Sequence, residues 1–251
     1  MKIRYILPGA LGKTELGARE IQRRQEKLRS WAFPGTDVDA VAIESGPATI
    51  ESMYERYISV PATAECVVKA QADGCDAAII GCFGDPGLDA LREISDMLIV
   101  GPAAASLNMA ATLCHRFSVI TVVPGLVPGL RRLAWEAGVI DKLASVRAVD
   151  LPVIEVNKDP DSALRKMIAE GATAVSEDGA EALVLGCMSM GFMDVSEKMS
   201  AELGVPVVNP VTTGLKVAES LAALGLRHSR KAYLRPKKMQ MGKSLADLYI
   251  R

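Results

Sequence analysis

The stretch DGCDAAIIGC at residues 73–82 returns as DGAEALVLGC at residues 178–187, 105 positions later at both ends (178 − 73 and 187 − 82). Five of the ten positions are identical, and the others are apolar or acidic in both copies, apart from Cys75 against Ala180. A second block, IVGP at 99–102, returns as VVNP at 207–210, and a helical pattern follows each copy. Repeats of this length indicate two similar halves, because a solenoid would need at least three shorter units.

Working outward from the repeat, short apolar runs alternate with amphipathic stretches along the whole chain, which is typical of parallel sheets covered by helices. Strands are expected at 3–7, 38–43, 77–81, 98–100, 118–123, 148–153, 182–186 and 205–208. Helices are expected at 16–30, 52–73, 89–96, 103–115, 126–137, 161–177, 195–203 and 213–224. The prediction is an α/β fold with two similar domains related by a pseudo-two-fold axis and an active site in the cleft between them. The first domain comprises residues 1–102 and 211–251, and the second comprises residues 103–210.

Both copies of the repeat end in Gly-Cys at the carboxyl end of a strand, where ligands bind in open parallel sheets. If the halves face each other, Cys82 and Cys187 meet across one cleft. A thiolate and a thiol on opposite sides of a carbon can remove a proton and return one, provided that a carbonyl acidifies the C–H. Backbone N–H groups in the turn after Cys82 would stabilise a thiolate or an enolate oxygen. A single buried cysteine is more often a packing residue, but two at duplicated strand ends favour chemistry.

Composition and the remaining motifs argue against several classes of protein. Hydrophobic residues make up 49% of the chain and charged residues 24%, as in globular proteins, and no apolar run reaches the length of a membrane-spanning helix. The net charge of −1 gives no basic field for nucleic acid. His115 and His228 have no partner at metal-ligand spacing, so we expect no metal, and no nucleotide-binding motif follows a strand. Five cysteines without a C-x-x-C pair favour free thiols in the cytoplasm.

Other chemically interesting residues are interpreted as structural. Asp85 is expected to serve its loop or a helix start rather than catalysis, because its position in the second copy holds Met190. Cys66, Cys75 and Cys114 have no counterpart in the repeat and are expected to pack. The basic stretch near the end is interpreted as a solvated face or an oligomer contact; it consists of Arg227, Arg230, Lys231, Arg235, Lys237, Lys238 and Lys243.

Several segments together resemble the hydantoin racemase branch of the aspartate/glutamate racemase superfamily: GPATIES at 46–52 with Tyr54, GCFGDPGL at 81–88, HRFSV at 115–119, LGC at 185–187 and PVVNPV at 206–211. The resemblance covers most of the chain. It implies two α/β domains of like fold, a two-base mechanism without a cofactor, and homo-oligomers. The two catalytic cysteines of that family correspond to Cys82 and Cys187.

Three segments depart from the family's pattern. Residues 8–11 read PGAL where the family has a polar Asn-Pro-Asn loop, residues 188–190 read MSM where it tends to have Ala-Gly-Met, and residues 122–125 read VVPG without polar groups. All three are expected at the cleft. The expected substrate-binding residues are Pro8, Gly9, Ile43, Phe83, Gly84, Thr121, Val122, Met188 and Ser189.

The leading hypothesis is racemisation of 5-monosubstituted hydantoins through a planar enolate, with a small molecule as the only partner beyond the homo-oligomer. Allantoin racemase, which has the same mechanism and a more polar ring substituent, is the first alternative, and the apolar loops weigh against it. Another isomerase or decarboxylase of the superfamily, acting on a small carbonyl acid, is the second. A non-enzymatic solute-binding protein is the third, and the paired thiols argue against it.

Overall fold

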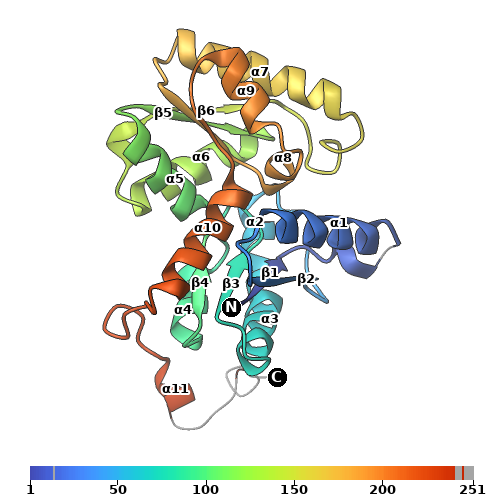
Figure 1. Ribbon diagram of the computed structural model, residues 1–251, viewed down its shortest axis with the longest axis vertical. Helices are drawn as coiled ribbons and strands as arrows, with labels where there is room; N and C mark the ends of the chain where they lie inside the picture. Colours follow the sequence, from blue (N-terminus) through green and yellow to red (C-terminus); the bar gives the residue numbers. More distant parts are fainter. Residues whose placement is uncertain (14, 241–244, 246–251) are drawn as a thin grey trace.

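The computed structural model describes residues 1–13, 15–240 and 245, and it contains two four-stranded sheets whose strand pairs are parallel (Figure 1). The first sheet has the order β2-β1-β3-β4, with β1 (Lys2–Leu7), β2 (Asp37–Ala42), β3 (Ala77–Ile80) and β4 (Leu98–Val100). The second has the order β6-β5-β7-β8, with β5 (Phe117–Thr121), β6 (Leu143–Ala148), β7 (Ala182–Leu185) and β8 (Val207–Val208). Counted along the chain, the two orders are the same, which confirms the predicted α/β fold of two similar halves.

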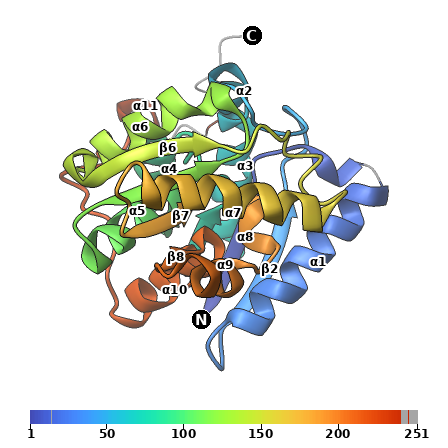
Figure 2. The same cartoon turned by 90° about the horizontal axis from the view of Figure 1, so that it is seen from above.

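Helices cover both faces of each sheet (Figures 1 and 2). They are α1 (Glu15–Trp31), α2 (Met53–Ile58), α3 (Val60–Ala72), α4 (Leu88–Ile94), α5 (Pro102–Leu113), α6 (Val127–Glu136), α7 (Pro160–Ser176), α8 (Met188–Phe192), α9 (Ser196–Leu203), α10 (Pro210–Ala223) and α11 (Lys237–Gln240). Among the described residues, none of these helices is long and apolar enough to cross a membrane.

Successive strand residues point into two separate cores, which explains why β3, β4, β7 and β8 are apolar at every position. In β1, Tyr5 faces the core covered by α1 and α10, whereas Ile6 faces the core covered by α3 and α4. In β7, Leu183 and Val184 divide in the same way between the core under α7 and α9 and the core under α5 and α6. The cores cover the two faces of each sheet, so the carboxyl ends of the strands are free to form a functional site.

The helices α5 and α10 each pack against the sheet of the other half. The helix α5 follows β4 of the first sheet but packs on β7 and β8 of the second, and α10 follows β8 but packs on β3 and β4. Each begins with a proline, Pro102 or Pro210, whose fixed φ suits the first helical turn. Figure 1 shows α10 running from the upper half down along the lower one, beside α5. The chain therefore crosses between the halves twice, and the two helices pack together at the crossing.

Several elements differ from the predictions. The strand expected at 148–153 is instead β6, at Leu143–Ala148, an edge strand that is half-buried throughout and carries the polar Ser145 and Arg147. The Ser145 hydroxyl hydrogen-bonds to that of Ser118, and Arg147 pairs with Asp178. Because these two strand residues are polar, the sequence of β6 has no continuous apolar run. The single helix expected at 52–73 is broken between α2 and α3 next to Pro61, which cannot continue a hydrogen-bonded helix. The short α8 was not predicted.

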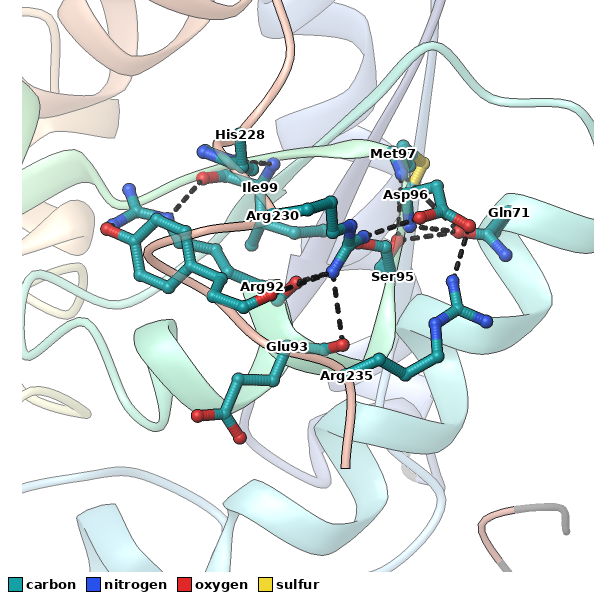
Figure 3. Close-up of polar contacts among 11 residues, drawn as sticks. Gln71, Arg92, Glu93, Ser95, Asp96, Met97, Ile99, His228, Arg230 and Arg235 are labelled. Atoms are coloured by element: carbon teal, nitrogen blue, oxygen red, sulfur yellow. Dashed lines mark hydrogen bonds and ion pairs between the residues drawn. The ribbon is translucent and has the colours of Figure 1, made fainter. Parts of the chain in front are cut away.

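Two residues of the basic stretch, Arg230 and Arg235, make contacts within the chain. Arg230 donates to the carbonyl oxygens of Arg92, Glu93 and Ser95 at the end of α4, and Arg235 pairs with Asp96 (Figure 3). The last carbonyl groups of a helix have no partner within the helix, and the guanidinium supplies one. The tail therefore returns to the first half. Lys243 lies outside the described residues.

His228 adds a pH-sensitive contact to this tail. Its Nε2 accepts the backbone N–H of Ile99 at 2.8 Å (Figure 3), and burial together with Arg92 lowers its pKa to about 4. The pKa of histidine in an unfolded chain is near 6.5, above the value in the folded protein. The contact therefore stabilises the folded protein fully above about pH 6.5, and this stabilisation is lost as the pH falls toward 4. We expect the intrinsic-rate-corrected amide exchange at Ile99 to speed up about tenfold or more between pH 7 and 4.5, measured by mass spectrometry.

His228→Gln is the matched control, because its amide oxygen can accept the same N–H but does not titrate. In this variant the acid-dependent step should disappear. An equal step in both proteins would show that another group controls the tail.

Candidate active site

The strand ends of both sheets open onto one cavity of about 820 Å³, counting the solvent at its mouth. Cys82, which follows β3, and Cys187, which follows β7, both line it. The rest of its wall comes from both halves: Leu7, Pro8, Gly9, Leu11, Arg24, Ala48, Thr49, Ile50, Ser52, Met53, Arg56, Gly81, Phe83 and Gly84 from the first, and Val122, Leu126, Gly129, Leu130, Leu133, Val153, Gly186, Met188 and Ser189 from the second. The repeat therefore brings one thiol from each half to a shared cavity with mostly apolar walls.

A glycine before each cysteine lets the end of the strand lie against its neighbour. A Cβ atom on Gly81 would come within 2.5 Å of Cζ of Tyr5, and one on Gly186 would come within 2.7 Å of Cγ1 of Val119. Both glycines donate their N–H to the central strand of their sheet, Gly81 to Ile6 and Gly186 to Ile120, each at 2.7 Å. The same local structure thus positions both cysteines.

Cys187 is buried and Cys82 is half-buried, and the surrounding protein raises the pKa of each thiol by keeping water away from it. For Cys82 the pKa rises to about 12, although the N–H of Gly84 lies 3.3 Å from its sulfur and Arg56 also favours the thiolate. For Cys187 the N–H groups of Met190 and Ser189 oppose the rise, as do Arg24 and the Ser189 side chain. A negative charge on Cys187 also raises the pKa of Cys82, so the arrangement favours one thiolate at a time.

Seven of the nine expected substrate-binding residues line the cavity: Pro8, Gly9, Phe83, Gly84, Val122, Met188 and Ser189. Two do not. Ile43 lies in the core beside Ile6 and Ile80, under α3. Thr121 is fully buried, and its hydroxyl donates to the carbonyl oxygen of Gly186 at 3.4 Å. Side chains alternate along a strand, so Val122 rather than Thr121 faces the cavity.

Sequence reasoning missed several residues of the wall. Thr49 and Ser52 belong to the segment 46–52, whose family resemblance was a usable signal. Arg24 had no such signal, because it is one of several arginines on the amphipathic helix α1, and Arg56 lies on the short helix α2 with no motif of its own. Their position became visible only when α1 and α2 were packed against the strand ends.

Loop contacts close the wall between the halves. A carboxylate oxygen of Glu51 accepts from the Thr49 hydroxyl at 3.2 Å and from the backbone N–H of Val153 at 3.1 Å. One side chain therefore links the wall residues Thr49 and Val153, which belong to different halves.

Asp85 has a structural role at the start of a helix, as predicted, and this helix is α5. It is 3% exposed and accepts the N–H groups of Ala103 and Ala104, at 3.1 and 2.9 Å, at the start of α5. Burial raises its pKa to about 7. It thereby connects the loop after Cys82 to the helix that crosses into the second half, rather than to α4.

Two thiols that open onto one cavity can serve a carbon acid from both sides. One, as the thiolate, accepts a proton from carbon, and the other, as the thiol, donates one to the opposite face. The chemistry needs a carbonyl beside the C–H bond and polar donors for the oxygen that becomes negative. The backbone N–H of Gly84, whose nitrogen lies 3.3 Å from the Cys82 sulfur, is one such donor.

Comparison with known proteins agrees with this geometry. The model of the Asp/Glu/hydantoin racemase family matches residues 18–218. A hydantoin racemase of Pseudomonas sp. (strain NS671) is 36% identical over 96% of this chain and 94% of its own, and one of Paenarthrobacter aurescens is 38% identical over 82% and 87%. The solved allantoin racemase of Klebsiella pneumoniae superimposes with a TM-score of 0.86 at 32% identity, covering 94% of both chains. With its duplicated sheets, its two strand-end cysteines and these relatives, the chain belongs to the Asp/Glu/hydantoin racemase family.

Proposed function

We propose that the protein racemises 5-monosubstituted hydantoins, with Cys82 and Cys187 as the two acid–base groups and no cofactor. The observation that carries the proposal is that cysteines at equivalent strand ends of the two halves line one cavity. Relatives named hydantoin racemase, 36% and 38% identical to this chain, support the substrate class.

In the proposed reaction, one cysteine as the thiolate takes the proton at C5 and becomes a thiol. The electron pair of the C–H bond moves into the adjacent carbonyl and gives a planar enolate. Backbone N–H groups that follow the cysteines, such as that of Gly84, stabilise the enolate oxygen. The other cysteine then gives its proton to the opposite face of C5 and becomes the thiolate, so the product is the enantiomer and no atom is gained or lost.

The side chains around the cavity support an apolar substituent at C5. A cluster of apolar side chains from both halves forms a large part of the wall; it consists of Ile50, Met53, Leu126, Leu130, Leu133 and Val153. Such a surface favours an alkyl or arylalkyl group over the polar ureido group of allantoin, because the ureido group would lose hydrogen bonds to water on entering it. Allantoin remains the second candidate, since a solved allantoin racemase is similar over 94% of this chain.

The test is proton NMR in D₂O together with optical rotation, on single enantiomers of 5-benzyl-, 5-isopropyl- and 5-(2-methylthioethyl)-hydantoin and of allantoin. Loss of the C5–H signal together with loss of rotation for the apolar substrates is the expected result. Faster racemisation of allantoin would move the assignment to the second candidate. Absence of exchange with every substrate would overturn the proposal and favour another isomerase or a decarboxylase.

A substitution at Met53 tests the apolar wall. Its Sδ lies 3.1 Å from the position of a Cβ on Gly129, so Met53 of the first half packs against the second half within the cavity. We expect Met53→Gln, which keeps the length of the side chain, to lower kcat/KM for 5-benzylhydantoin about tenfold relative to allantoin. Met109→Gln, on the outer part of α5, is the control and should leave that ratio unchanged.

We also propose that the protein works as a homo-oligomer in the cytoplasm. The five cysteines are free, which suits a reducing compartment. Light scattering of the purified protein would measure the number of subunits.

A further inference from the structure

We propose that Arg24 is a positioning residue that acts through the Ser189 hydroxyl to make Cys187, rather than Cys82, the first of the two thiols to lose its proton. The assignment of acidity rests on the contacts described below. The consequence for turnover rests, in addition, on the proposed racemase function.

Arg24 is a buried cation at the cavity. It lies on α1, is 5% exposed, and lines the same cavity as the two cysteines. A guanidinium keeps its charge even when it is buried. Its Nε is paired with Glu20 at 2.8 Å, and its guanidinium carbon lies 4.8 Å from the ring centre of Phe192. These two contacts hold the planar group in one orientation.

In that orientation Arg24 donates a hydrogen bond to Ser189. The distance from Nη2 to the Ser189 Oγ is 3.0 Å, and the bond is buried. Ser189 stands two residues after Cys187, in α8, and its side chain favours the Cys187 thiolate. A serine hydroxyl has a single proton. Because its oxygen accepts from Arg24, that proton is left to be donated to a thiolate on Cys187. The proposed series then runs from the cation through the hydroxyl to the thiolate.

Cys82 has a different environment. The backbone N–H of Gly84 reaches its sulfur at 3.3 Å, and the cation that favours its thiolate is Arg56 on α2. The buried carboxyl group of Asp85, three residues along the chain, disfavours a negative charge there. The Cys187 side of the cavity thus has a buried cation that acts through a hydroxyl, and the Cys82 side has a neighbouring carboxyl group. The duplicated backbone is symmetric, but the charges around it are not.

Because of this asymmetry, the free protein has the protonation state that one direction of racemisation needs and not the state that the other needs. With Cys187 as the thiolate and Cys82 as the thiol, the free protein is ready for the enantiomer whose C5–H faces Cys187. After that turnover Cys187 holds the substrate's proton and Cys82 is the thiolate. The proton must then move from Cys187 to Cys82, through water, before the same enantiomer can react again.

The test measures thiol acidity in the full-length protein without substrate. Iodoacetamide alkylation is followed from pH 6 to 11, and mass spectrometry gives the rate separately for Cys82 and Cys187. We expect Cys187 to reach its midpoint within this range, whereas the rate for Cys82, whose pKa is about 12, should still be rising at pH 11. Arg24→Gln should raise the Cys187 midpoint by about one pH unit, a tenfold loss of reactivity at a fixed lower pH, and leave the Cys82 rate nearly unchanged at every pH. Arg24→Lys should restore part of the shift.

Arg23→Gln is the matched control. Arg23 is on the same helix and also pairs with Glu20, but its side chain is 39% exposed and it has no contact with Ser189 among the interactions of the described residues. Its loss should leave the Cys187 midpoint and the Cys82 rate unchanged. Ser189→Ala removes only the hydroxyl and should shift the Cys187 midpoint in the same direction as Arg24→Gln, which provides the test if Arg24→Gln does not fold.

Unchanged Cys187 reactivity in folded Arg24→Gln and Ser189→Ala, or equal shifts at both cysteines, would overturn the assignment. The proposed function is judged separately. If Arg24→Gln shifts Cys187 but the wild-type protein racemises neither hydantoins nor allantoin, the acidity assignment stands and the function fails. With an active substrate, Arg24→Gln should lower kcat more than it changes KM and move the rising limb of the pH–rate profile to higher pH by the same amount as the alkylation midpoint.

Discussion

Cys82→Ala and Cys187→Ala are each expected to lower the rate of racemisation about 10³-fold, while each variant still exchanges the C5 proton of one enantiomer with D₂O. The remaining thiolate can remove a proton from the face that it contacts and return deuterium to that same face. It cannot reach the opposite face, so optical rotation persists while the C5–H signal decays. The two variants should retain exchange for opposite enantiomers, because the two cysteines come from opposite halves.

The measurement is proton NMR in D₂O on each pure enantiomer, with optical rotation recorded on the same samples. Cys114→Ala is the control, because this thiol lies outside the cavity and donates to the carbonyl oxygen of Ala110 within its own half of the molecule. It should racemise at nearly the wild-type rate. Near-wild-type racemisation by Cys82→Ala or Cys187→Ala would contradict the two-base mechanism, and loss of all exchange for both enantiomers in both variants would contradict the independent roles of the two thiols.

Gly81→Ala is expected to reduce stability by about 2 to 3 kcal/mol, since the new methyl group has no space. Its Cβ would stand 2.5 Å from Cζ and 2.7 Å from the hydroxyl oxygen of Tyr5, whose ring is fully buried in the core under α1 and α10. Either the ring or the end of β3 must move. Movement of β3 displaces the sulfur of Cys82, and a displacement of about 1 Å at a catalytic group costs about 10² in rate.

The temperature of thermal unfolding and the rate of racemisation should therefore both fall in Gly81→Ala. Adding Tyr5→Leu removes the clashing ring atoms and should recover part of the lost racemisation, although it leaves a cavity in the core. Gly214→Ala is the control, because a Cβ at this position in α10 meets its nearest atoms only at 3.6 Å. It should be neutral or slightly stabilising, as alanine is favoured over glycine inside a helix. A Gly81→Ala protein as stable and active as Gly214→Ala would contradict the role assigned to the glycine.

The parts of the molecule that were predictable from the sequence are those encoded over short distances. The duplicated segment ending at Cys82 and Cys187 predicted the repeated α/β half, and the equal strand order of the two sheets confirms it. A strand buried on both faces is apolar at each position, so β3 and β7 were recognisable. The half-buried edge strand β6 was not, because Ser145 and Arg147 make their contacts with Ser118 and Asp178 on other elements.

Much of the cavity wall depends on how helices pack, and local sequence does not determine this. Arg24 is one arginine among several on α1, and only the packing of that helix beside α8 brings it to Ser189 and the Cys187 side. In the same way, the return of the tail to β4 depends on carbonyl groups left without partners at the end of α4. The sequence alone therefore determined the repeated scaffold and the two thiols at its strand ends, since both follow from local pattern. Only the tertiary structure decided which charges and apolar side chains surround each thiol, because these come from segments far apart in the chain.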